Sequence, residues 1–202
     1  MKIKSLMIPD PITITEDASI ENAIDIMKVN SIRHLPVVSG KENILKGFVT
    51  MADLRLGLIP SMVSDVELSD VMINDPVTVD PDDDVEIAAQ LIYKHKIGGM
   101  PVVRENKLVG IITESDILRT FIDMMGILSG SSRVDVEIGD DPEAFNRALR
   151  IIQENDGDII NIGMTAHRSD KRVYYFRLLA CDTGVICDAF EESGFKVVEA
   201  TN

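Results

Sequence analysis

The chain contains two copies of one pattern, and this internal repeat constrains its fold more than any other feature. The run Gly-x-x-Thr-x-x-Asp closes the pattern at residues 47–53 and again at residues 110–116. Eight further residues of the first copy recur 65 positions later in the second: Met7, Pro11, Thr13, Ala23, Ile32, Pro36, Val37 and Val38. The spacing falls to 63 at the closing run, so the first copy carries two extra residues, which we place in the polar stretch 39–43. Such a duplication indicates two supersecondary units that bury their apolar faces against each other.

Each copy is predicted to fold as strand, helix, strand, strand, helix, because its hydrophobic period changes from two to 3.6 and back. A short extended piece at residues 12–14 precedes a helix, for which Ser19 and its counterpart Asp84 are candidate N-caps. Two strands joined by a polar turn follow at residues 36–38 and 45–50, with equivalents at 101–103 and 108–113.

The closing run predicts a seat for a phosphate and a ribose. Because a strand ends and a helix starts at Thr50, its hydroxyl and the first free N–H groups face a space where the helix dipole favours an anion. The Asp53 carboxylate, one turn further, can accept two hydrogen bonds from a ribose diol. Gly47 lets a ligand or a neighbouring strand approach the backbone. The alternative is that Thr50 and Asp53 form a capping arrangement that needs no ligand.

Residues 1–122 resemble a tandem pair of cystathionine-beta-synthase (CBS) domains, the regulatory Bateman module. The resemblance rests on Met7-x-x-x-Pro11-x-Thr13, on His34-Leu35-Pro36-Val37 and on the Gly-x-x-Thr-x-x-Asp run, each with a second copy. It implies clefts between the paired domains that bind adenosine nucleotides or related adenosyl ligands. The nucleotide-binding residues that it implies are Thr13, Arg33, His34, Pro36, Gly47, Thr50, Asp53, Arg55, Thr78, Pro101, Gly110, Thr113 and Asp116.

The resemblance also implies roles within this set. Thr50 and Thr113 would contact phosphate, Asp53 and Asp116 would contact the ribose, and the extended segments around Thr13 and Thr78 would contact the base.

The two copies differ just before their second strand, where family members contact phosphates. The first copy has Arg33 and His34, whose guanidinium and imidazole can meet a phosphate, whereas the second has two glycines. Arg55 adds a cation beside the first closing run, where the second copy has Leu118. We therefore expect two unequal sites, with a phosphorylated ligand depending on Arg33 and His34. The alternative makes these two surface residues at a turn, and the sequence leaves open which cleft they serve.

Residues 126–132 are mostly small and predict a linker, and residues 133–202 predict a separate domain. Its expected elements are a strand at 133–138, a helix opening at 140–143, strands at 159–166 and 173–180, a helix at 183–193 and a strand at 195–198. This βαββαβ order is the ferredoxin-like arrangement, so the whole chain is predicted to be α/β (α+β).

The C-terminal domain resembles an ACT domain, mainly in its element order. The resemblance implies that it joins subunits or holds a small effector, such as an amino acid, at the loop of Asp140, Asp141 and Pro142. Ligand-binding members carry glycine after this proline, whereas Glu143 follows it here, which favours packing or dimerisation. CBS repeats followed by such a domain also resemble the AcuB-like proteins of acetoin utilisation, which implies a metabolic enzyme as partner.

Composition limits the other possibilities. The formal charge of −14 divides equally, since residues 1–122 hold 12 basic and 19 acidic side chains and residues 123–202 hold 8 and 15. Such a surface argues against nucleic-acid and membrane partners. No apolar run has transmembrane length and no signal peptide is evident, so we expect a cytoplasmic protein.

No catalytic constellation or metal site is predicted. The three histidines are dispersed, and Cys181 and Cys187 lack a metal-ligand spacing. The acidic run 82–84 could suggest a metal, but acidic residues at a helix start are favoured by the dipole.

The leading hypothesis is a cytosolic regulatory protein that is not an enzyme and needs no cofactor. Its repeats, expected at residues 1–65 and 66–125, would sense an adenosine nucleotide, and its ACT-like domain would dimerise or transmit the signal. The alternative is an assembly protein or accessory subunit of a metabolic enzyme system such as acetoin utilisation, whose Thr and Asp residues merely cap helices.

Overall fold

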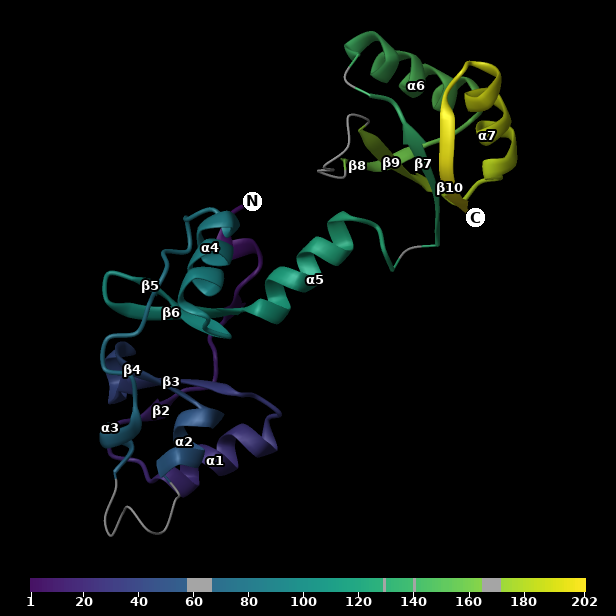
Figure 1. The fold of residues 1–202 in the computed structure, drawn as a ribbon. Coiled ribbons are helices and arrows are strands. Elements are labelled where there is room, and N and C mark those ends of the chain that lie inside the picture. The colour runs from purple at the N-terminus through teal and green to yellow at the C-terminus, as the bar shows by residue number, and fades with distance from the viewer. Residues whose placement is uncertain (58–66, 129, 140, 165–171) are drawn as a thin grey trace. The chain divides into compact units, whose positions relative to one another are not determined.

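The computed structural model describes residues 1–57, 67–128, 130–139, 141–164 and 172–202 (Figure 1). The chain divides into two compact units, residues 1–118 and residues 119–202. We describe each unit by itself.

The first unit contains the predicted element order twice. The first copy comprises β2 (Ile14–Thr15), α1 (Ile20–Val29), β3 (His34–Ser39), β4 (Ile44–Thr50) and α2 (Met51–Gly57). The second comprises α4 (Val85–His95), β5 (Gly99–Arg104), β6 (Lys107–Thr113) and α5 (Glu114–Met124), which continues past the unit boundary. An isolated bridge between Val79 and Val102 takes the place that β2 has in the first copy. The remaining short elements are η1 (Ile3–Ser5), β1 (Ile8–Pro9), η2 (Gly40–Glu42) and α3 (Leu68–Val71).

The two long helices begin where the sequence predicts them. The Ser19 hydroxyl caps α1 by accepting a hydrogen bond from the Asn22 backbone N–H at 3.1 Å. The Asp84 side chain does not cap α4, although Asp84 stands at the N-cap position, because its carboxylate pairs with the Lys2 ammonium at 3.0 Å. Both helices bury their apolar stripe against a sheet, as their periodicity indicates.

The two-residue insertion lies where the sequence places it. The hairpin of β3 and β4 closes at the pair Ser39 and Ile44, which leaves four residues in the turn. The hairpin of β5 and β6 closes at Arg104 and Lys107, which leaves two. The two turns contact each other, since Leu45 N–H donates to the Asn106 carbonyl and Leu108 N–H donates to the Asn43 carbonyl. One six-stranded sheet thus runs through both copies.

The two copies exchange their leading segments, a feature that the sequence analysis missed. Residues 3–7 pack into the core of the second copy, where Ile3 is fully buried, and residues 68–72 pack into the core of the first, where Leu68 is fully buried. The segment 3–7 lies beside α4 in Figure 1, and α3 lies beside α2. The predicted boundary at residues 65/66 falls outside the described residues, and the two cores do not follow it.

Close backbone contacts complete the exchange. β1 pairs with β6, and Phe48 pairs with Ile73. A Cβ on Gly47 would lie 2.6 Å from the Met72 Sδ and 3.0 Å from the Ile73 carbonyl oxygen. Gly110 has the same relation to Met7 and Ile8. The space beside the Gly47 backbone is therefore occupied by a neighbouring segment of the chain and not left for a ligand.

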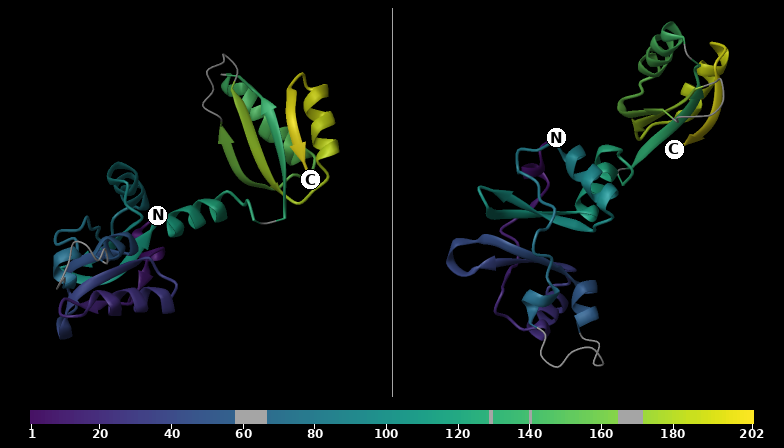
Figure 2. Two further views of the ribbon diagram at one scale, coloured as in Figure 1. Left: turned by 60° about the horizontal axis from the view of Figure 1, so that its bottom comes forward. Right: turned by 60° about the vertical axis from the view of Figure 1, so that its left-hand side comes forward.

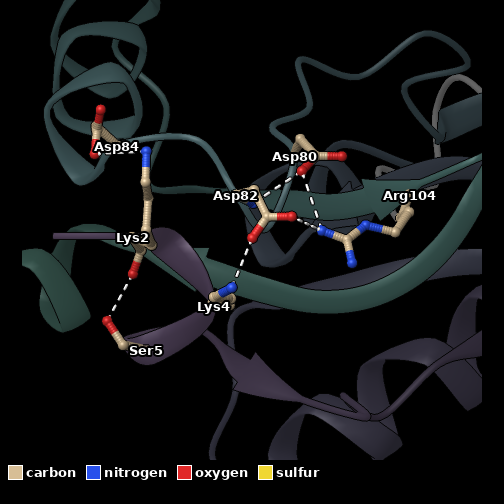
Figure 3. Close-up of polar contacts among 7 residues, drawn as sticks. All are labelled: Lys2, Lys4, Ser5, Asp80, Asp82, Asp84 and Arg104. Carbon is tan, nitrogen blue, oxygen red and sulfur yellow. Dashed lines mark hydrogen bonds and ion pairs between the residues drawn. The ribbon is translucent and has the colours of Figure 1, made fainter.

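Ion pairs also fix the N-terminal segment on the second copy (Figure 3). The Lys4 ammonium lies 2.8 Å from the Asp82 carboxylate, and Arg104 pairs with both Asp80 and Asp82. The hydrogen bond from Lys4 holds the pKa of Asp82 below its usual value. Because these groups are exposed, the burial of Ile3 contributes more to the anchoring than they do. Lys4 and Arg104 therefore pair with the acidic run considered above as a metal site.

The second unit folds as an antiparallel sheet with both helices on one face (Figure 2). Its elements are β7 (Ser131–Glu137), α6 (Pro142–Glu154), β8 (Ile159–Met164), β9 (Val173–Leu179), α7 (Thr183–Glu192) and β10 (Lys196–Thr201). The strand order β10-β7-β9-β8 and the element order βαββαβ are those of the predicted ferredoxin-like arrangement. β7 begins at Ser131, so the last two residues of the predicted linker lie within a strand. The fully buried centre of the core consists of Val134, Val136, Phe176 and Leu178 from the sheet with Ala148, Ile152, Ile186 and Phe190 from the helices.

Candidate functional site

The closing run forms a reciprocal cap in both copies. The Asp53 Oδ2 accepts hydrogen bonds from the Thr50 N–H at 2.9 Å and from its hydroxyl at 2.7 Å, while the Asp53 N–H donates to the Thr50 Oγ1 at 3.3 Å. Asp116 and Thr113 repeat this pattern at 2.9, 2.6 and 3.4 Å. The capping alternative is therefore present in the fold. These bonds use Oδ2 and leave Oδ1 out of the cap.

Two cavities lie between the copies. The larger, of about 630 Å³, is lined by Arg33, His34, Phe48, Thr50, Met51, Ala52, Asp53 and Arg55 of the first copy and by Ile73, Asp75, Pro76, Val77, Lys96, Ile97, Gly98, Gly99 and Glu114 of the second. The smaller, of about 320 Å³, is lined by Ile8, Pro11, Ile12, Ser31, Ile32, Arg33 and His34 of the first copy and by Ile111, Thr113, Ser115 and Asp116 of the second. Each cavity thus combines the closing run of one copy with the leading segment of the other.

Seven of the predicted residues line a cavity. Arg33, His34, Thr50, Asp53 and Arg55 line the larger. Arg33 and His34 also line the smaller, together with Thr113 and Asp116. Arg33 and His34 therefore line both clefts, which the sequence left open.

Six predicted residues line neither cavity: Thr13, Pro36, Gly47, Thr78, Pro101 and Gly110. The two prolines are buried within β3 and β5, and the two glycines lie under the exchanged segments. In place of Thr13 and Thr78, the preceding residues Ile12 and Val77 line the cavities, because side chains alternate along an extended chain.

Sequence reasoning missed several lining residues. Asp75, Lys96 and Glu114 come from the second copy yet line the cavity that holds the first closing run. The sequence holds no local signal for them, because they reach this cavity only through the packing of one copy on the other. Arg33, Arg55 and Lys96 are exposed, and none forms an ion pair with another residue in the part of the chain that the structure describes. The larger cavity therefore offers three cations beside Asp53, Asp75 and Glu114.

His34 occupies a defined position in the wall of both cavities. Its half-buried ring stacks on Phe48, with ring centroids 5.9 Å apart and an angle of 16° between the planes. Its Nε2 would lie 2.8 Å from a Cβ on Gly98, so the ring rests against the backbone of the second copy. Burial, and then the neighbouring Arg33, lower the pKa of His34 below 6.5, whereas Glu114 and Asp53 act in the opposite direction.

The predicted effector loop of the C-terminal unit serves as a helix start. The Asp141 carboxylate accepts a hydrogen bond from the Glu143 N–H at 3.0 Å, and Pro142 occupies the first helical position. Asp140 lies outside the described residues. Among the described residues, no group of three or more His, Cys, Asp or Glu side chains is arranged to hold a metal ion. No helix within the described ranges has the length and apolarity to span a membrane.

The fold and the paired clefts define a tandem-repeat module of the α/β class. The family model of the CBS domain matches residues 3–59 and 68–123, which is more than half of the chain. The chain therefore belongs to the CBS domain family.

Three similar proteins show how widely this module occurs. A protein of Vibrio cholerae assigned to acetoin utilization (AcuB) is 32% identical with a TM-score of 0.58, covering 63% of this chain and 96% of that one. The CBS domain pair of MJ0100, in complex with 5′-methylthioadenosine and S-adenosyl-L-methionine, is 30% identical with a TM-score of 0.55, covering 60% and 99%. Inosine-5′-monophosphate dehydrogenase of Methanocaldococcus jannaschii is 33% identical over 85% of this chain, which spans only 34% of that enzyme.

Proposed function

We propose that the CBS pair is a regulatory sensor of an adenosine nucleotide or related adenosyl ligand, and that the larger cavity takes the phosphates. The observation that carries the proposal is the convergence of Arg33, His34, Arg55 and Lys96 with Thr50 and Asp53 around one cavity. A volume of about 630 Å³ is in the range of small-molecule sites. The adenosyl ligands of the MJ0100 pair support the choice of ligand class.

Each group in the cavity has a role in this proposal. The cations bind the phosphates with charge-assisted hydrogen bonds, and thereby overcome the acidic field of a chain with a charge of −14. The Asp53 Oδ1, which the cap does not use, accepts from the ribose hydroxyls. Ile73 and Val77 provide an apolar surface for the base.

The ligand would act by bridging the two copies. It favours one relative arrangement of them to the extent that it binds that arrangement more tightly than the other. The ACT-like domain then dimerises or passes the change to a partner, and the chain performs no chemistry of its own. We place the protein in the cytoplasm.

The second candidate function is an assembly or accessory role in a metabolic enzyme system such as acetoin utilisation. Two observations favour it. The hydrogen bonds between Thr50 and Asp53 and between Thr113 and Asp116 cap helices, so these residues have a structural role without a ligand. The similarity to the AcuB protein supports the choice of acetoin utilisation as the metabolic setting to test.

A titration at two pH values tests the sensor. A bound phosphate favours the charged imidazolium of His34 and raises its lowered pKa, so binding takes up a proton. AMP affinity should therefore rise about three- to tenfold between about pH 8 and about pH 6, as measured by calorimetry. Adenosine affinity should stay constant.

His34→Gln is the matched control, because it keeps a hydrogen-bonding side chain and cannot become charged. The phosphate itself titrates near pH 6, so the comparison of wild type with this variant isolates His34. Absence of saturable binding of AMP, ADP, ATP and S-adenosylmethionine at both pH values would reject the sensor and favour the assembly role.

A further inference from the structure

The two cavities share part of their wall. Among the described residues that line them, Arg33 and His34 are the only two common to both. They stand at the start of β3, where the chain passes between the cavities. A ligand in either cavity therefore meets the same guanidinium and the same imidazole.

The duplication does not supply a second such pair. The counterparts of Arg33 and His34 in the second copy are Gly98 and Gly99, and the missing side chain of Gly98 leaves the space in which the His34 ring lies. The larger cavity has two further cations, Arg55 and Lys96, whereas the described lining of the smaller has no lysine or arginine besides Arg33. Besides Thr113 and the start of α5, the described lining of the smaller cavity offers an anion only the shared residues, which stand beside Asp116.

We propose that Arg33 and His34 couple the two cavities, so that a phosphorylated ligand in the larger one weakens the binding of a second phosphorylated ligand in the smaller one. The coupling rests on the proposed nucleotide site. A phosphate that takes the guanidinium in a bidentate contact uses part of its donors and neutralises its charge, so a second phosphate meets a weaker attraction. An uncharged nucleoside in the smaller cavity does not need this charge and is unaffected. The effect is reciprocal, as any coupling of binding free energies must be.

Two equivalent substitutions allow each cavity to be measured alone. Ala52 lines only the larger cavity and Ser115 only the smaller, and both are exposed second residues of a helix, 63 positions apart. Ala52→Trp should fill the larger cavity and Ser115→Trp the smaller, each leaving one AMP site. Methionine at the same positions is the milder replacement if a tryptophan variant fails to fold.

The wild-type calorimetric isotherm then measures the coupling. The coupling factor is the dissociation constant of the second ligand in wild type divided by that of the same ligand in Ala52→Trp. If the cavities are coupled, this factor is at least about ten for AMP and below about two for adenosine. In Arg33→Ala the AMP factor should fall below about three, because only screened repulsion between the ligands remains.

The outcomes separate the two proposals. An AMP factor below two in wild type, with both single-cavity variants binding, would overturn the coupling and leave the sensor intact. A factor that Arg33→Ala does not reduce would also overturn it. Failure of wild type and variants to bind AMP would overturn the coupling, and the sensor would fall with it only if ADP, ATP and S-adenosylmethionine also failed to bind.

Discussion

Replacement of Gly47 by valine is expected to lower the free energy of unfolding of the CBS pair by about 3 kcal/mol. A Cβ at this position would lie 3.0 Å from the Ile73 carbonyl oxygen and 2.6 Å from the Met72 Sδ. The methionine side chain can turn aside, but the carbonyl cannot, because Ile73 exchanges two backbone hydrogen bonds with Phe48 at 3.0 and 2.8 Å. The added side chain must push the exchanged segment away from β4.

Urea unfolding measures this loss, and Gly40→Val is the matched control. Gly40 has no atom within 4 Å of a Cβ position, so its replacement should change stability by less than about 0.5 kcal/mol. Gly110→Val should reproduce the Gly47 result, since Gly110 contacts Met7 and Ile8 at the same distances. Equal stability of Gly47→Val and Gly40→Val would mean that no backbone segment lies against Gly47.

Replacement of Arg33 by alanine is expected to weaken AMP binding about 10- to 100-fold. A hydrogen bond to a charged group contributes about 1.5–3 kcal/mol, and Arg33 has no carboxylate partner among the described residues that would hold it away from the ligand. Adenosine lacks the phosphate, so its affinity should change less than about threefold. Calorimetric titration with both ligands measures the difference.

Arg119→Ala is the control for Arg33→Ala. Arg119 is an exposed arginine of α5 that lines neither cavity, and its removal changes the net charge by the same amount. If Arg33→Ala weakened adenosine and AMP equally, Arg33 would support the shape of the cavity and would not bind phosphate.

The sequence predicted the order of elements because each copy carries its own period and its own caps. Local geometry determines three of the predicted features: the cap at Ser19, the strands of both hairpins and the position of the two-residue insertion. The exchange of segments could not be predicted, because the two leading segments are nearly identical in sequence. Gly47 and Gly110 each contact a methionine followed by an isoleucine. A repeat makes the two pairings look alike in sequence, so the sequence could not distinguish them.

The candidate site was predictable only in part for the same reason. The residues of the closing run were predicted because their pattern occurs twice and because its threonine and aspartate lie within one helical turn. Lys96 and Asp75 reach the first closing run only through the packing of one copy on the other. Arg33 and His34 line both cavities where Gly98, the counterpart of Arg33, leaves room for the His34 ring, and only the folded structure shows where this ring lies.

The central claim is that the clefts between the copies bind an adenosine ligand. Calorimetric titration of the wild-type chain with AMP, ADP, ATP and S-adenosylmethionine tests it most directly, with thermal unfolding of the same samples as a second readout. A ligand that binds only the folded state adds about 2.7 kcal/mol of stability at a concentration of 100 times its Kd. We predict saturable binding and a raised melting temperature with at least one of the four. Binding and stabilisation by none of them would contradict the account.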